Sequence, residues 1–227
     1  MSYIRGSGDG TQRSAQHTLT LDDSAIASHP GRLRVSSWLW TRRYPKWPVL
    51  LAVALVATVV LSFTVDRMFL ASVPLALIPN VFYWKRVREH FRHGDANPGV
   101  VVSRDPLRIA VWTDMTKGEG SYPVLRVFGE PPWEVEGKPL DVGTRVATVG
   151  LYAVDEEEAR PYWERFDPRP VAPVAAEEAE AQALLESFGP ERWERLERAV
   201  TTMGAVEEGL HRLELEGSSW GRLQSVG

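Results

Sequence analysis

The chain has 227 residues, a net charge of −4 and no cysteine, which excludes disulfides, thiolate metal sites and cysteine nucleophiles. Residues 1–96 carry 12 Lys and Arg against 6 Asp and Glu, whereas residues 97–227 carry 14 against 24. An acidic C-terminal part repels phosphates, so we expect no nucleic-acid partner.

The first 36 residues are rich in Ser, Thr, Gly and Asp and contain few large apolar side chains. Such a segment does not bury enough apolar surface to offset the entropy of ordering its backbone. The composition therefore predicts a disordered N-terminal tail over residues 1–36.

Two uncharged apolar segments come next, Trp47–Val65 with 19 residues and Met68–Trp84 with 17, separated by Asp66 and Arg67. A bilayer core about 30 Å thick needs roughly 20 residues of helix. The pattern predicts a transmembrane hairpin within residues 37–96, although a re-entrant hairpin has the same sequence pattern. Pro74 and Pro79 lie inside the second segment and predict kinks there.

Aromatic and basic residues flank both segments, as is typical of membrane helices. Because cations favour the cytoplasmic side, we expect both termini in the cytoplasm of a bacterium, with the hairpin in its inner membrane. The cations after the second segment either are only a topology signal or also bind lipid headgroups, which makes membrane lipids a predicted partner. The flanking cations are Arg42, Arg43 and Lys46 before the hairpin, and Lys85, Arg86, Arg88 and Arg92 after it.

Residues 97–170 show the short β-branched runs and turn residues of a β-domain. Four or five strands within such a length predict a small antiparallel β-barrel or half-barrel, like the OB or SH3-like folds. The predicted strands are Gly99–Val102, Leu107–Val111, Val124–Phe128 and Arg145–Tyr152.

Residues 171–227 are predicted to be a C-terminal helical segment. Glu177–Ser187 is rich in helix formers, and Pro190 is suited to the first turn of a second helix. Apolar residues at spacings of three and four predict a buried face that packs on the β-domain, or alternatively a seam for self-association. These residues are Trp193, Leu196, Val200 and Met203. Val206, Leu210 and Leu213 extend the pattern, although we expect Gly204 to bend or break the helix.

Candidate chemistry is sparse. His90 and His93 lie three residues apart near Asp95, a spacing that zinc could use, but we interpret these histidines as neighbours of the headgroup zone and predict no metal or other cofactor. The acidic run at 155–158 lacks the spacing of a calcium loop. The sequence contains no Gly-rich phosphate loop, nucleophile elbow or H-E-x-x-H pair, so we predict no catalytic residues.

The stretch YWKRVREHFRHGDANPGVVV at Tyr83–Val102 and the later WERFDPRPV at Trp163–Val171 resemble an uncharacterised family of bacterial membrane proteins. In that family a hydrophobic hairpin leads through an N-P-G-x-V-V segment into a β-rich domain. The resemblance covers roughly residues 45–175 and leaves out the C-terminal helices. It implies an architecture but no activity.

The leading hypothesis is a membrane-anchored cytoplasmic interaction module, whose β-domain binds a protein or ligand. One alternative is a membrane-associated enzyme or accessory subunit, which a cleft joining His90, His93 and Asp95 would favour. A second alternative is a structural hairpin that self-associates through small residues such as Ala52, Ala54 and Ala57.

Overall fold

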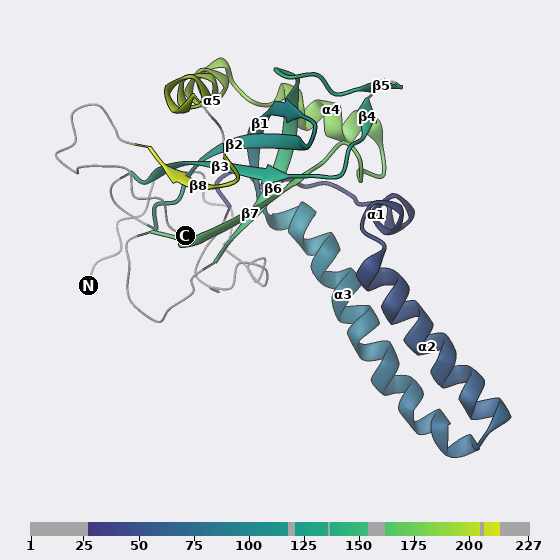
Figure 1. Ribbon diagram of the computed structural model, residues 1–227. Coiled ribbons are helices and arrows are strands. Elements are labelled where there is room, and N and C mark those ends of the chain that lie inside the picture. Colours follow the sequence, from purple (N-terminus) through teal and green to yellow (C-terminus); the bar gives the residue numbers. More distant parts are fainter. Residues whose placement is uncertain (1–26, 118–120, 136, 154–161, 205–206, 214–227) are drawn as a thin grey trace, which may run out of the picture.

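The structure is a computed structural model with two long apolar helices, a six-stranded antiparallel sheet and C-terminal helices (Figure 1). This confirms the α+β class predicted from the sequence. The model describes residues 27–117, 121–135, 137–153, 162–204 and 207–213.

The hairpin begins after a short helix, α1 (Ser37–Arg43), whose N-terminus is capped by the Ser36 hydroxyl. Helix α2 (Lys46–Thr64) and helix α3 (Val73–His93) form its two legs, joined by the 3-10 helix η1 (Arg67–Ser72). The Asp66 carboxylate accepts a hydrogen bond from the Met68 amide at 2.7 Å and so caps η1.

The two prolines of the second leg have different positions. Pro74 lies in the first turn of α3, where a missing N–H costs little, so the predicted kink at this residue is wrong. Pro79 lies inside α3, as expected. The second leg continues without interruption to His93 and carries the cationic residues that follow the apolar segment.

The hairpin projects from the sheet (Figure 1). Many of its large apolar side chains are exposed. By length and composition, Lys46–Thr64 and Arg67–His93 are both apolar enough to cross a membrane, and only 11% and 0% of their apolar windows are buried. Phe63 is 81% exposed and Met68 82%. A core helix of a soluble domain of this size buries its apolar face, whereas these two helices do not.

One polar contact joins the two legs. The Asn80 amide nitrogen donates to the Leu51 carbonyl across the hairpin at 3.1 Å, and to the Ala76 carbonyl in its own helix. The small residues Ala52, Ala54 and Ala57 are exposed on α2. Self-association through these alanines stays a prediction.

The sheet is an open half-barrel, one of the two forms predicted from the sequence. Its strand order is β7-β6-β1-β2-β3-β8, with β7 and β8 at opposite edges, and every neighbouring pair is antiparallel. A separate two-stranded ribbon pairs β4 with β5. The strands are β1 (Asp95–Arg104), β2 (Leu107–Asp114), β3 (Pro123–Gly129), β4 (Glu134–Val135), β5 (Lys138–Pro139), β6 (Arg145–Ala153), β7 (Arg165–Pro170) and β8 (Gly209–Arg212).

Both faces of the sheet are buried, which explains why its central strands are almost continuously apolar. Along β2, Ile109 and Val111 face one cluster with Trp163, while Ala110 between them belongs to the other. This second cluster is formed with the end of α3 and with the helices α4 (Glu178–Glu186) and α5 (Pro190–Met203). Within the described part of the chain, helices therefore cover one face of the sheet.

The C-terminal segment follows the prediction as far as Gly204. Gly204 adopts a φ of 66° and ends α5, which confirms the predicted break at this residue, and Leu210 and Leu213 therefore do not extend the helical face. Leu210 instead pairs with Arg126 in strand β8, and the Leu213 amide donates to the Pro123 carbonyl. Val206 lies outside the described residues.

The predicted disordered tail is wrong for residues 27–36. Leu33 is buried in the helix-covered core, and its amide donates to the Phe91 carbonyl at 3.2 Å. Pro30 bridges to Asp95, and Val35 bridges to Ala175. This segment joins β1, the end of α3 and the C-terminal part, because backbone pairing compensates for its few apolar groups. Residues 1–26 lie outside the described part.

Candidate functional site

A groove of about 260 Å³ lies where the hairpin leaves the sheet. Helix α1 and the start of α2 form one wall, the last turns of α3 form another, and β7 closes it. Its lining is largely aromatic, and its charged groups lie on α3 and β7. The lining residues are Trp40, Tyr44, Trp47, Tyr83, Arg86, Val87, His90, Asp167 and Arg169.

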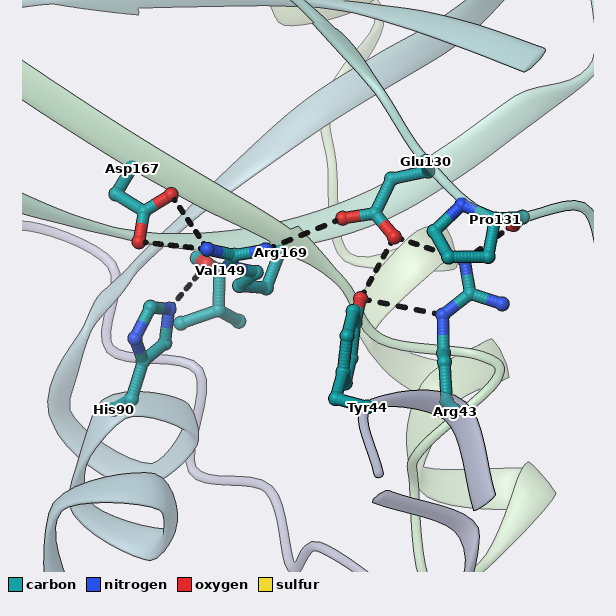
Figure 2. A network of polar contacts seen from close by, with 8 residues as sticks. All are labelled: Arg43, Tyr44, His90, Glu130, Pro131, Val149, Asp167 and Arg169. Carbon is teal, nitrogen blue, oxygen red and sulfur yellow. Dashed lines mark hydrogen bonds and ion pairs between the residues drawn. The ribbon is translucent and has the colours of Figure 1, made fainter. Parts of the chain in front are cut away.

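A polar network at this junction centres on Glu130, which lies directly after β3 (Figure 2). Its Oε2 accepts hydrogen bonds from Arg43 Nη2 at 2.9 Å and from the Tyr44 hydroxyl at 2.7 Å. Arg169 Nη1 lies 3.6 Å from the other carboxylate oxygen of Glu130, and Arg169 Nη2 pairs with the Asp167 carboxylate at 3.2 Å. Arg43 donates a further bond to the Pro131 carbonyl. The network therefore joins the helix before the hairpin to two strands.

Burial and charge shift the pKa values of this network. Burial, together with the neighbouring Glu130 carboxylate, raises the pKa of Tyr44 to about 12. Burial alone lowers the pKa of the Arg169 guanidinium, but the charge of Asp167 and further negative neighbours outweigh burial and raise it overall. Tyr44 is therefore a hydrogen-bond donor and Arg169 a cation at neutral pH.

Trp40 and Tyr83 connect α1 to α3 in the lining of the groove. The Trp40 indole N–H donates to the Tyr83 hydroxyl at 2.7 Å, which leaves the hydroxyl with its own proton to donate. Trp40 also packs edge-on against Phe91, with ring centroids 5.8 Å apart. These contacts fix α1 against α3 at the base of the hairpin.

The four cations predicted to meet lipid headgroups all lie in the last turns of α3. Lys85, Arg88 and Arg92 follow one another at helical spacing on one side, whereas Arg86 lines the groove. Lys85 forms a surface ion pair with Glu89 at 3.6 Å. The structure therefore separates one of the four, Arg86, from the other three.

The three weak metal candidates are divided between two places. His90 lines the groove and donates from Nε2 to the Val149 carbonyl at 2.9 Å (Figure 2). His93 and Asp95 instead line a separate cavity of about 90 Å³ together with Asp114. Among the residues that the structure describes, no three His, Asp or Glu side chains gather closely enough to hold a metal ion.

The carboxylates of that cavity are occupied by hydrogen bonds. Asp95 accepts from the His29 amide and from the buried Tyr152 hydroxyl, each within 3.0 Å. Asp114 accepts from Thr116, Ser121 and Tyr122, and these bonds outweigh the effect of burial and lower its pKa. Burial and the charge of Asp95 raise the pKa of Tyr152 well above its usual value. These contacts brace the start of β1 and the loop after β2.

Sequence reasoning missed Glu130 and Arg169, which hold the junction together. Glu130 lies 87 residues from Arg43, and no local periodicity links the two. Arg169 stands in the quoted WERFDPRPV stretch, where the alternation of charges with prolines was the only local signal. The acidic run at 155–158 lies outside the described residues.

A model of the family "Protein of unknown function (DUF3239)" matches residues 84–204, which include the end of α3, most of the sheet and both C-terminal helices. The chain belongs to the DUF3239 family. The resemblance expected from the sequence is thus confirmed, although its expected range of roughly 45–175 is wrong at both ends, because the DUF3239 match begins at Trp84 and extends through α5.

Among solved structures, the chain is similar to a "putative membrane protein from Corynebacterium diphtheriae" at 16% sequence identity and a TM-score of 0.44. That match covers 52% of this chain and 100% of the other. No curated protein matches the DUF3239 chain.

Proposed function

We propose that this DUF3239 protein is a membrane-anchored interaction module. Its hairpin crosses the bacterial inner membrane and holds the half-barrel at the cytoplasmic surface, where the half-barrel binds a protein or ligand. The observation that carries the proposal is the exposure of two adjacent apolar helices that project away from the sheet (Figure 1).

The length of the hairpin supports this proposal. Helix α2 has 19 residues, which at about 1.5 Å per residue approaches the thickness of a bilayer core of about 30 Å. In water, the large exposed side chains of both legs form one continuous apolar surface, far larger than monomeric soluble proteins tolerate. Burial among lipid acyl chains removes the free-energy cost of exposing this apolar surface to water.

The charges support the proposed orientation. Basic residues flank the base of the hairpin, next to the sheet, whereas the far end carries only Asp66 and Arg67. Arg43 is paired with Glu130, so Arg42 and Lys46 supply the cationic signal on the first leg. A cytoplasmic half-barrel agrees with this distribution.

The hydrogen bonding of three carboxylates favours a binding role over a catalytic one. Asp95, Asp114 and Glu130 each accept at least two hydrogen bonds from the protein. A general base needs a carboxylate within reach of substrate, whereas these carboxylates hold the fold together.

Cysteine labelling in cells tests the anchor and its orientation, because the natural chain has no cysteine. We expect Arg67→Cys, at the far end of the hairpin, to react with a membrane-impermeant maleimide in cells whose outer membrane is opened. Val142→Cys, on an exposed turn of the sheet domain, is expected to react only after the inner membrane is also opened.

Labelling of both positions before the inner membrane is opened would contradict a cytoplasmic half-barrel. A membrane-bound protein unlabelled at Arg67→Cys would indicate a re-entrant hairpin. Full-length protein that stays in the supernatant after high-speed centrifugation without detergent would overturn the anchor. The interaction role is tested by purification from membranes in mild detergent, and failure to enrich any partner over an α2–α3 hairpin control would contradict it.

A further inference from the structure

The groove lies at the base of the hairpin, at a level along both legs that their residue composition defines. Trp47 is the second residue of α2, and Tyr83 lies just before the cationic turns of α3, so both legs change from apolar to charged at the groove. In a hairpin that spans a bilayer, this level corresponds to the cytoplasmic headgroup layer. The inference below therefore rests on the proposed membrane function.

Arg86 gives the groove a cation that the protein itself does not neutralise. Among the residues described, no carboxylate forms an ion pair with Arg86, whereas Lys85 beside it pairs with Glu89 at 3.6 Å. The one carboxylate that lines the groove, Asp167, is paired with Arg169 at 3.2 Å. The groove thus has a net positive charge and is complementary to an anion.

The remaining lining is mostly aromatic and leads onto the apolar hairpin. Trp47 is 55% exposed and continues the groove directly into the lipid-facing surface of α2. Trp and Tyr rings prefer the interface between headgroups and acyl chains, since they have an apolar body and a polar end. From Arg86 through Tyr83 to Trp47, the groove therefore passes from charged to amphipathic to apolar.

A phospholipid has the same order, from phosphate through glycerol to acyl chain. The volume of about 260 Å³ is below the roughly 300–1,000 Å³ of sites that enclose a drug-sized ligand, which suits a headgroup with its glycerol rather than a whole lipid. We propose that this groove binds one anionic phospholipid of the cytoplasmic leaflet, with its phosphate at Arg86 and an acyl chain along Trp47 and α2.

This site differs from a general attraction of basic residues to an anionic membrane. Lys85, Arg88 and Arg92 form a cationic face at helix positions i, i+3 and i+7, to which any anionic surface is attracted. Arg86 lies apart from this face and borders the groove. Removal of one charge from each place therefore distinguishes a bound lipid from a diffuse attraction.

The test uses full-length protein in a neutral detergent, mixed with equal amounts of phosphatidylglycerol and phosphatidylcholine and analysed by native mass spectrometry. We expect one phosphatidylglycerol to be retained in preference to phosphatidylcholine. Arg86→Gln is expected to reduce that retention at least about fivefold, the equivalent of about 1 kcal/mol for one interfacial cation. The matched control Arg88→Gln removes the same charge two residues away and is expected to change retention less than about twofold.

Arg86→Lys keeps the charge and is expected to retain most of the lipid, while Trp47→Ala is expected to weaken retention without changing the net charge. Equal losses in Arg86→Gln and Arg88→Gln, or equal retention of both lipids by the natural chain, would overturn the groove site. The thermal melting of each variant in detergent is measured first, to show that the variant is folded. Cell fractionation then shows whether the variant is in the membrane. Membrane-bound, folded protein without lipid preference refutes the groove alone, whereas soluble protein refutes the anchor.

Discussion

Arg43 and Glu130 form a buried ion pair, with Arg43 Nη2 2.9 Å from Glu130 Oε2 and with side chains that are only 7% and 1% exposed. Arg43 ends α1, just before the hairpin, and Glu130 follows β3, so the pair connects the proposed membrane anchor to the sheet. The Tyr44 hydroxyl and Arg169 share the same carboxylate (Figure 2). These contacts fix the base of the hairpin against the half-barrel.

Glu130→Ala is expected to destabilise the protein by about 3–5 kcal/mol, because it leaves Arg43 and Arg169 without a shared carboxylate in a desolvated place. Urea unfolding in detergent micelles, followed by near-ultraviolet circular dichroism, measures this loss. The double variant Arg43→Met with Glu130→Met is expected to recover part of it, since no lone charge stays buried between them. An unfolding midpoint unchanged in Glu130→Ala argues against the pair as a structural link.

Tyr44 makes the stability sensitive to alkaline pH. Its pKa is raised from 10 to about 12 by burial and by Glu130, so the neutral hydroxyl stabilises the folded state. This contribution is complete below pH 10 and is lost as pH rises from about 10 to about 12. Tyr44→Phe is expected to lower stability at pH 8 and to flatten the decline above pH 10.

Tyr162→Phe serves as the control for this prediction, because the Tyr162 ring stacks on Tyr122 at 4.1 Å, away from Glu130. Unfolding is measured at intervals from pH 8 to pH 12. Equal slopes for Tyr44→Phe and the natural chain would show that Tyr44 does not carry the effect.

Gly150 allows β6 to pass directly under a ring of β7. An added Cβ would overlap the Phe166 side chain, with Phe166 Cζ at only 2.7 Å. Gly150→Ala is therefore expected to cost about 1–3 kcal/mol through overpacking. In a double-mutant cycle, Phe166→Leu is expected to relieve part of that cost, whereas strictly additive losses would place the strain elsewhere.

Asn80 is expected to hold the two hairpin legs together inside the membrane. Asn80→Leu removes the bond to the Leu51 carbonyl and is expected to cost about 0.6–1 kcal/mol, a typical value for polar contacts between membrane helices. The control Thr64→Val removes a hydroxyl bond to Val60 within α2 alone. A larger loss in the control, measured by thermal melting in micelles, would contradict a joining role for Asn80.

Local sequence patterns were sufficient to predict the hairpin and the four longest strands, β1, β2, β3 and β6. An unbroken apolar run indicates a helix without reference to the rest of the chain, and short β-branched runs between turn residues, as in Leu107–Val111 and Arg145–Tyr152, indicate strands in the same way. Strand β7 escaped prediction because its two prolines disfavour central strands, and it is accommodated at the sheet edge. The half-barrel form was predicted only as one of two alternatives.

The apolar hairpin, its basic flanks, the strand-rich centre and the helix formers that follow could all be predicted from local sequence, because each depends on neighbouring residues. Three contacts could not: Leu210 joins a strand, Leu33 enters the core, and Arg43 pairs with Glu130. These contacts join residues far apart in the chain, and they depend on which surfaces the fold brings together. The groove beside Arg86 is likewise formed by residues that lie far apart in the chain.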